Sequence, residues 1–136
     1  KEILKNIFSV IFGIMIGGIV NMSLLQILMK IIPPPSGFDL NSTEGLEKAM
    51  PFFEPMHFLA PFLAHAMGTF IGAFIVGFLT KKVRLSLLVG VVFLIGGVSM
   101  VFSVPSPLWF NIIDLFFAYI PMAYLGFVLS SKIKII

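Results

Sequence analysis

The chain contains no cysteine, and only 11% of its 136 residues are charged. The missing cysteine excludes disulfide bonds, thiolate metal sites and cysteine nucleophiles. The low charge argues against a soluble domain, in which about a quarter of the residues would be charged. Because 59% of the residues are hydrophobic and the mean hydropathy is +1.11, the composition predicts an integral membrane protein with a single domain over residues 1–136.

Four apolar segments are long enough to cross a hydrocarbon core roughly 30 Å thick, which takes about 20 helical residues. They predict an all-α fold, a polytopic membrane protein with four transmembrane helices in one bundle. The first segment is too long for the apolar region of a signal peptide, so we interpret it as an uncleaved span. The predicted spans are residues 3–32, 57–80, 85–104 and 109–131.

Basic residues gather at one end of these spans. They precede the first span, fill the connection between the second and third, and close the chain, whereas the other two connections are acidic or uncharged. Under the positive-inside rule both termini are cytoplasmic. With the basic residues in this role, the net charge of +3 does not indicate nucleic-acid binding. The basic residues of this charge pattern are Lys1, Lys5, Lys81, Lys82, Arg84, Lys132 and Lys134.

The connection over residues 33–56 is the only sizeable segment outside the predicted spans. Its triple proline predicts an extended, stiff start. A capping arrangement of Asn41 with Glu44 predicts a short helix from Ser42 to Met50. We expect this outer-loop helix to be a lid or an interfacial helix, and a simple connector is the alternative.

Small residues recur at every fourth position on the first two spans, which predicts close helix packing. The packing could be within one protomer, or it could join a homo-oligomer or a larger membrane complex. The third span has three glycines and no strongly polar residue, and is predicted to be scaffold or a lipid-facing wall. Pro61 and Pro121 predict kinks in the second and fourth spans. The two ridges are Ser9, Gly13, Gly17 and Asn21, and Ala60, Ala64, Gly68 and Gly72.

Polar residues within the spans are the best candidates for a site. His57 and His65 are eight residues apart, so in one helix they share a ridge. At about 1.5 Å per residue, Asn21, His65 and Asp114 lie at similar depth, roughly 8 to 15 Å from the outer ends of their spans. An ionisable group at that depth usually faces protein or a water-filled cavity. With Asn111 one turn above Asp114, these side chains are predicted to converge on one outward-facing pocket.

Several roles for this pocket stay open. His65 and Asp114 could form a proton relay or a ligand-orienting pair in a transport path. Glu54, His57, His65 and Asp114 suit a divalent metal, although the two histidines would be about 12 Å apart in an ideal helix. His65 as a catalytic base lacks an accompanying nucleophile, and no cofactor is indicated. The polar residues could also simply hydrogen-bond across helices and fix the bundle.

The leading hypothesis is therefore a small membrane protein that transports or binds a small ligand or ion. The alternative is a structural or accessory subunit of a larger membrane complex. A pocket requires His65, Asn21 and Asp114 to face one another within a protomer. An accessory subunit would instead present its glycine ridges to a partner.

Four stretches carry distinctive motifs: residues 53–58 (FEPMHF), 61–69 (PFLAHAMGT), 105–111 (PSPLWFN) with Asp114, and 17–22 (GGIVNM) with the later triple proline. Together they resemble a family of small, uncharacterised four-helix bacterial membrane proteins. The resemblance covers nearly the whole chain and implies a multi-pass protein of the bacterial cytoplasmic membrane. It implies no activity, and no catalytic or ligand residues carry over from it.

Overall fold

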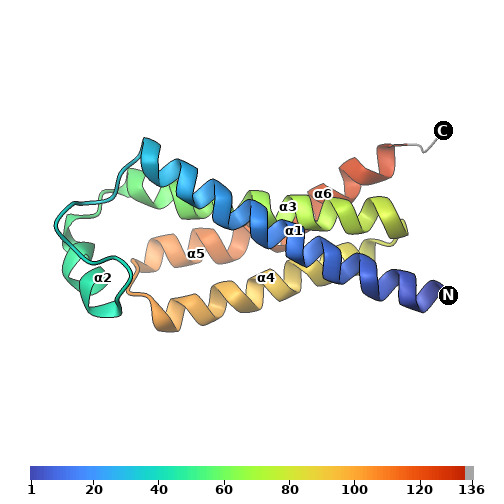
Figure 1. Ribbon diagram of the computed structural model, residues 1–136, viewed down its shortest axis with the longest axis horizontal. Helices are drawn as coiled ribbons and strands as arrows, with labels where there is room; N and C mark the ends of the chain where they lie inside the picture. The colour runs from blue at the N-terminus through green and yellow to red at the C-terminus, as the bar shows by residue number, and fades with distance from the viewer. Residues whose placement is uncertain (134–136) are drawn as a thin grey trace.

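The computed structural model describes residues 1–133, so Lys134 of the charge pattern lies outside the described residues. Helices joined by short connections make up this part of the chain (Figure 1), which confirms the predicted all-α class. Four helical segments are long and apolar enough to cross a membrane, and their ends differ from the predicted spans by two residues at most. The helices are α1 (Glu2–Ile31), α2 (Thr43–Ala49), α3 (Leu59–Thr80), α4 (Val83–Ser103), α5 (Leu108–Phe117) and α6 (Ile120–Lys132).

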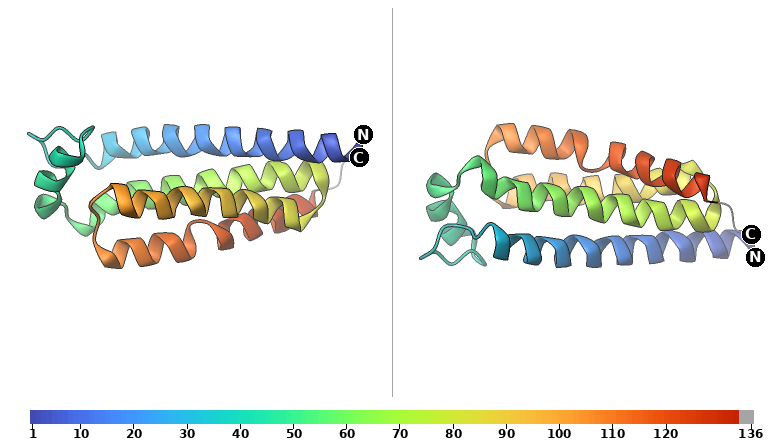
Figure 2. Two further views of the ribbon diagram at one scale, coloured as in Figure 1. Left: turned by 90° about the horizontal axis from the view of Figure 1, so that it is seen from below. Right: turned by 90° about the horizontal axis from the view of Figure 1, so that it is seen from above.

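The long helices run side by side, with α3 in contact with α1, α4 and α6. The two views of Figure 2 show α2 across one end of the molecule, with the start of α1 and the end of α6 at the other. Ala73, Val76, Val89 and Ala123 form a buried core where α3, α4 and α6 meet. Large apolar side chains cover the outside instead, which suits helices that contact lipid. On α1 these exposed residues include Ile7, Ile11, Met15, Ile19 and Met22.

Glycines bring the backbones of α1 and α3 into direct contact. A Cβ atom on Gly17 would lie 2.6 Å from the carbonyl oxygen of Gly68, and one on Gly72 would lie 2.7 Å from that of Gly13. Only glycine permits so close an approach at these positions. The predicted packing of the first two spans is therefore confirmed, and it lies within one protomer. Because the two glycine ridges pack against each other, they do not face a partner.

The fourth apolar segment breaks between α5 and α6. Tyr119 has φ −115° and ψ −81°, outside the helical region, and Pro121 follows near the start of α6. Proline lacks the N–H that would continue the hydrogen-bond ladder, so the predicted kink at Pro121 is confirmed. Pro61 behaves differently, because α3 begins only at Leu59. Its missing N–H falls in the first turn, where none is needed, and the expected kink there is wrong.

The helix in the outer loop is present, with a different cap from the predicted one. Ser42 precedes α2, and its hydroxyl accepts a hydrogen bond from the backbone N–H of Gly45 at 3.1 Å. Asn41 instead donates its own backbone N–H to the carboxylate of Asp39. Two short 3₁₀ turns, η1 (Met50–Phe52) and η2 (Pro55–Phe58), lead from α2 into α3.

At the opposite end of the molecule, two lysines connect neighbouring helical segments. Lys82 forms an ion pair with Glu2 at 2.6 Å, which joins the α3–α4 connection to the start of α1. The ammonium of Lys81 donates to the carbonyl oxygens of Ser130 and Ile133 at 3.3 and 3.2 Å. A cation is favoured at the C-terminal end of a helix such as α6. Lys81 and Lys82 therefore lie at the end away from α2.

Candidate functional site

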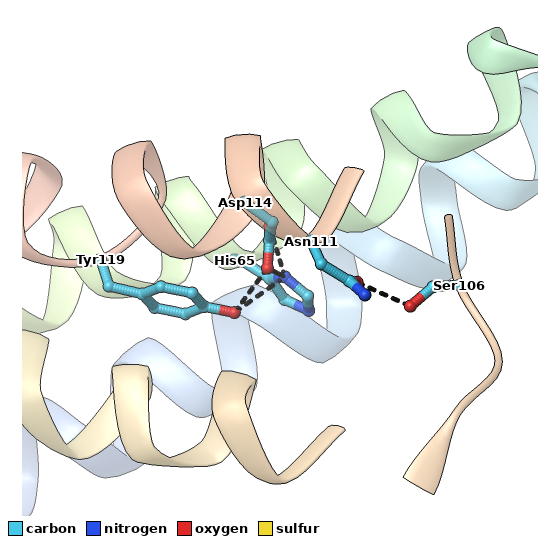
Figure 3. Close-up of polar contacts among 5 residues, drawn as sticks. All are labelled: His65, Ser106, Asn111, Asp114 and Tyr119. Carbon is cyan, nitrogen blue, oxygen red and sulfur yellow. Dashed lines mark hydrogen bonds and ion pairs between the residues drawn. The ribbon is translucent and has the colours of Figure 1, made fainter. Parts of the chain in front are cut away.

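His65, Asp114 and Tyr119 form a hydrogen-bonded cluster in the interior of the protein (Figure 3). The Nδ1 atom of His65 lies 2.9 and 3.0 Å from the two carboxylate oxygens of Asp114. The Tyr119 hydroxyl donates to Oδ2 of Asp114 at 2.9 Å and lies 3.1 Å from Nδ1 of His65. Asp114 is 4% exposed and Tyr119 is 2% exposed. We call these three residues the polar cluster.

The break in the fourth segment assembles the polar cluster. Asp114 is on α5, whereas Tyr119 lies in the break five residues later. Residues five apart point to different faces of a continuous helix, so the two side chains meet only because the helix stops. On the other side, Gly97 of α4 leaves room for the Tyr119 ring, because a Cβ at this glycine would collide with the phenol. The third span is thus a scaffold for the site.

Tyr119 was not among the site residues predicted from the sequence, although its hydroxyl completes the polar cluster. The available signal was Pro121, which follows it by two residues. A proline at that point ends the preceding helix and frees the residues before it to turn. The phenol then reaches back to the carboxylate of Asp114.

The contacts of His65 determine which of its ring nitrogens is available. All of its hydrogen bonds to described residues involve Nδ1. An ionised carboxylate only accepts hydrogen bonds, so we assign the proton of the neutral ring to Nδ1, donating to Asp114. The Nε2 atom then keeps a lone pair, which can accept a proton or a hydrogen bond. A carboxylate partner of this kind also fixes the orientation of an imidazole.

A cleft of about 270 Å³ lies at the end of the molecule near α2. We call it the α2-end cleft. Leu46 and Met50 cover it from α2 and the following turn, and its walls are mainly apolar. Five polar residues also line it, which places four of the predicted site residues around a single space. They are His57, His65, Ser106, Asn111 and Asp114.

A second cleft, of about 380 Å³, lies between α1 and α4. We call it the side cleft. Asn21 lines it together with His65 and Tyr119, so the remaining predicted site residue faces the polar cluster from α1. His65 lines both clefts, as do Gly97 and Met100. The imidazole therefore lies where the two spaces adjoin.

Two predicted site residues make their direct contacts outside the polar cluster. Asn111 accepts a hydrogen bond from the hydroxyl of Ser106 at 2.6 Å, beside the cluster (Figure 3). The Nδ1 atom of His57 accepts the backbone N–H of Glu54 at 2.8 Å, which caps the η2 turn. Because η2 is a 3₁₀ turn before α3, the prediction of one continuous helical ridge through His57 and His65 is wrong.

The predicted metal ligands do not form a common group. Glu54 and His57 contact each other at the start of α3, while His65 and Asp114 pair inside the protein. Within residues 1–133, no three or more histidine, aspartate or glutamate side chains are placed to hold one ion. A metal at this site would therefore have to rely on fewer protein ligands than were predicted.

The site combines a mainly apolar space with one oriented, titratable imidazole. Such a group can exchange a proton with a ligand, or it can hydrogen-bond to one. The apolar walls can hold a nonpolar part of the same ligand.

Comparisons of the chain with protein-family models, with curated proteins and with solved structures gave no match.

Proposed function

We propose that this is a small membrane protein that binds a small ligand and carries it across part of the membrane. The ligand hydrogen-bonds to His65. The observation that carries the proposal is the position of the imidazole. Its Nδ1 is fixed by Asp114, while the ring lines two clefts at once. A group held in this way can meet a ligand from either space and exchange a proton with it.

The lining of the α2-end cleft supports a ligand rather than a helix-fixing role for the polar residues. Mostly apolar walls with a few convergent polar groups are typical of small-molecule sites. Asn111 lines the cleft near the imidazole and offers a further hydrogen bond. His57 also lines the cleft, but its Nδ1 atom already accepts the backbone N–H of Glu54. Residues that only fixed the bundle would be closed off between helices, as Asp114 and Tyr119 nearly are, whereas His65 and Asn111 border the cleft.

The proposal includes an orientation. The α2-end cleft lies at the end opposite the basic residues, such as Lys81 and Lys82. By the positive-inside rule the lysines are cytoplasmic, and this cleft opens to the outside. The bacterial cytoplasmic membrane, which the motif resemblance implies, completes the proposed location.

The alternative of an accessory subunit finds less support. That role would direct the glycine ridges toward a partner, yet Gly13, Gly17, Gly68 and Gly72 pack against one another within the protomer. Assembly into a homo-oligomer would have to use other surfaces, and it stays a prediction.

The test is to purify the protein in gentle detergent from its native membrane and to identify co-extracted small molecules by mass spectrometry. The informative variant is His65→Asn, because the asparagine N–H can still donate to Asp114 while the Nε2 atom is lost. We expect a small molecule bound to the wild type, and roughly tenfold less of it in the variant, as the loss of one good hydrogen bond predicts.

His57→Asn is the matched control, since it makes the same exchange at the rim of the cleft. It should retain most of the bound molecule. Equal amounts of ligand in the wild type and in His65→Asn would contradict the proposal. A larger protein recovered in fixed ratio, with no small molecule, would favour the accessory subunit.

A further inference from the structure

The side cleft opens toward the outer surface of the protein between α1 and α4. Its rim includes Val92 and Met100, which are 38% and 51% exposed, while Tyr119 at its inner end is 2% exposed. The cleft thus leads from an apolar outer surface inward to the polar cluster. On the outside, its rim continues into exposed apolar side chains such as Ile19 and Ile95.

Two glycines keep the side cleft open. Gly18 on α1 and Gly96 on α4 both line it, and a Cβ atom at either position would meet nothing within 4 Å. Their neighbours Gly17 and Gly97 are different, because added atoms there would collide with Gly68 and with Tyr119. Helix packing therefore explains Gly17 and Gly97, whereas at Gly18 and Gly96 the missing side chain only leaves space in the cleft.

Polar groups are found at the inner end of this space. Asn21 lines it with an amide that can both donate and accept. His65 reaches it with the ring whose Nδ1 is already bonded to Asp114, which leaves Nε2 for a ligand. An apolar passage that ends at such groups matches a molecule with a hydrocarbon chain and a small uncharged head group. A charged head group would be costly to bring through an apolar opening.

We infer that the side cleft admits, directly from the bilayer, a single-chain amphiphile whose hydroxyl or carbonyl head group hydrogen-bonds to His65. The inference rests on the proposed function, because it assigns a ligand class and an access route to the same site. The head group lies between Asn21 and His65. The chain leaves through the gap at Gly18 and Gly96 and lies along the apolar outer faces of α1 and α4.

The test uses photocrosslinking in phosphatidylcholine vesicles that contain the reconstituted full-length chain. The probe is a long-chain alcohol with a diazirine group close to its hydroxyl, and the comparison probe is the same chain without the hydroxyl. Labelled positions are located by peptide mass spectrometry. We expect the alcohol to label the side cleft at Phe93, Met100 or Tyr119, and the plain hydrocarbon to label these positions much less.

The decisive variant is the double substitution Gly18→Leu and Gly96→Leu, which fills the cleft. Leucine has a better helix propensity than glycine, and both positions have room, so the helices should form normally. The matched control, Ile19→Leu with Ile95→Leu, puts leucines one residue away on the outer surface. Labelling by the alcohol should fall roughly tenfold in the first variant, as loss of a bound state predicts, and persist in the second.

Equal labelling by both probes would overturn the inference, since the cleft would then hold any hydrocarbon chain. Unchanged labelling in the double-leucine variant would overturn it as well. The proposed function is tested separately by the co-purified molecule. If that molecule is lost in His65→Asn but kept in the double-leucine variant, access from the bilayer is wrong and the proposed function stands. If the wild type carries no such molecule, and the alcohol labels no cleft residue, both fail.

Discussion

Asp114 accepts hydrogen bonds from two donors that come from different parts of the chain, His65 of α3 and Tyr119 of the break before α6. Its carboxylate is almost fully buried. A buried carboxylate without partners is costly, so these two donors allow it to occupy this position. In return the carboxylate holds the imidazole in one orientation, in a ring that lines both clefts.

The assigned tautomer of His65 can be measured. The chain has only two histidines, so nitrogen NMR of histidine-labelled protein gives two sets of signals, and the His57→Asn variant assigns them. We expect the neutral ring of His65 to carry its proton on Nδ1, because Asp114 accepts there. A proton found on Nε2 instead would contradict the assignment, since Nδ1 would then be the acceptor for Tyr119.

Removal of the acceptor and removal of one donor should differ in their effect on stability. Asp114→Ala leaves both the imidazole N–H and the Tyr119 hydroxyl without their acceptor, which predicts a loss of about 1–3 kcal/mol in the free energy of unfolding. Tyr119→Phe removes one hydrogen bond, for which roughly 0.6 kcal/mol is the average in membrane proteins. Unfolding in a denaturing detergent measures both losses. Tyr124→Phe, at a half-exposed position, is the control and should change little.

Some features of the helices that form the site can be predicted from the sequence pattern, and others cannot. The four long segments and the close packing of α1 on α3 follow from the lengths of the apolar runs and from the spacing of small residues. The similar depth of His65 and Asp114 in the spans made them candidates for one pocket, but it did not establish that they contact each other. These features depend on helix geometry alone, which is regular enough to extrapolate from sequence.

Features that depend on an interruption of a helix could not be foreseen in the same way. The contact between Tyr119 and Asp114 needs the break before α6, and a continuous helix would place them apart. His57 was expected on the ridge of His65, but the turn that begins at Pro55 takes it out of α3. Pro61 was expected to bend α3, although the start of the helix at Leu59 makes it harmless.

A pair of neighbouring glycines on α1 offers a direct test of the helix packing. Gly17→Leu would force a side chain into the carbonyl oxygen of Gly68, whereas Gly18→Leu meets open space. Overpacking of this kind costs about 1–3 kcal/mol or more, so Gly17→Leu should lower the resistance to a denaturing detergent clearly. Gly18→Leu should leave it nearly unchanged. Similar losses in both variants would contradict the close approach of α1 and α3.

The distribution of charge and apolar surface over the whole molecule suits the proposed placement across a membrane in one direction. The apolar outer faces of the helices lie between an end covered by α2 and an end held by lysines. The α2-end cleft and the basic end are therefore expected on opposite sides of the membrane. The side cleft opens between them, along the length of the helices.

This orientation can be measured against an empty background, because the chain has no cysteine. Ser36→Cys lies in the loop before α2 and Ser131→Cys lies near the end of α6, and both serines are exposed. A membrane-impermeant maleimide added to intact spheroplasts should label the first variant and spare the second. After the membrane is opened, both should react. The reverse pattern would place the α2-end cleft on the cytoplasmic side.

The close glycine packing of α1 on α3 also has a consequence for the order in which the protein is assembled. Both helices are complete once the chain has been synthesised as far as Thr80, so their contact can form during insertion, before the later segments emerge. Asp114 lies on α5, which is synthesised later. The hydrogen bond between His65 and Asp114 can therefore form only after the contact between α1 and α3 has become possible.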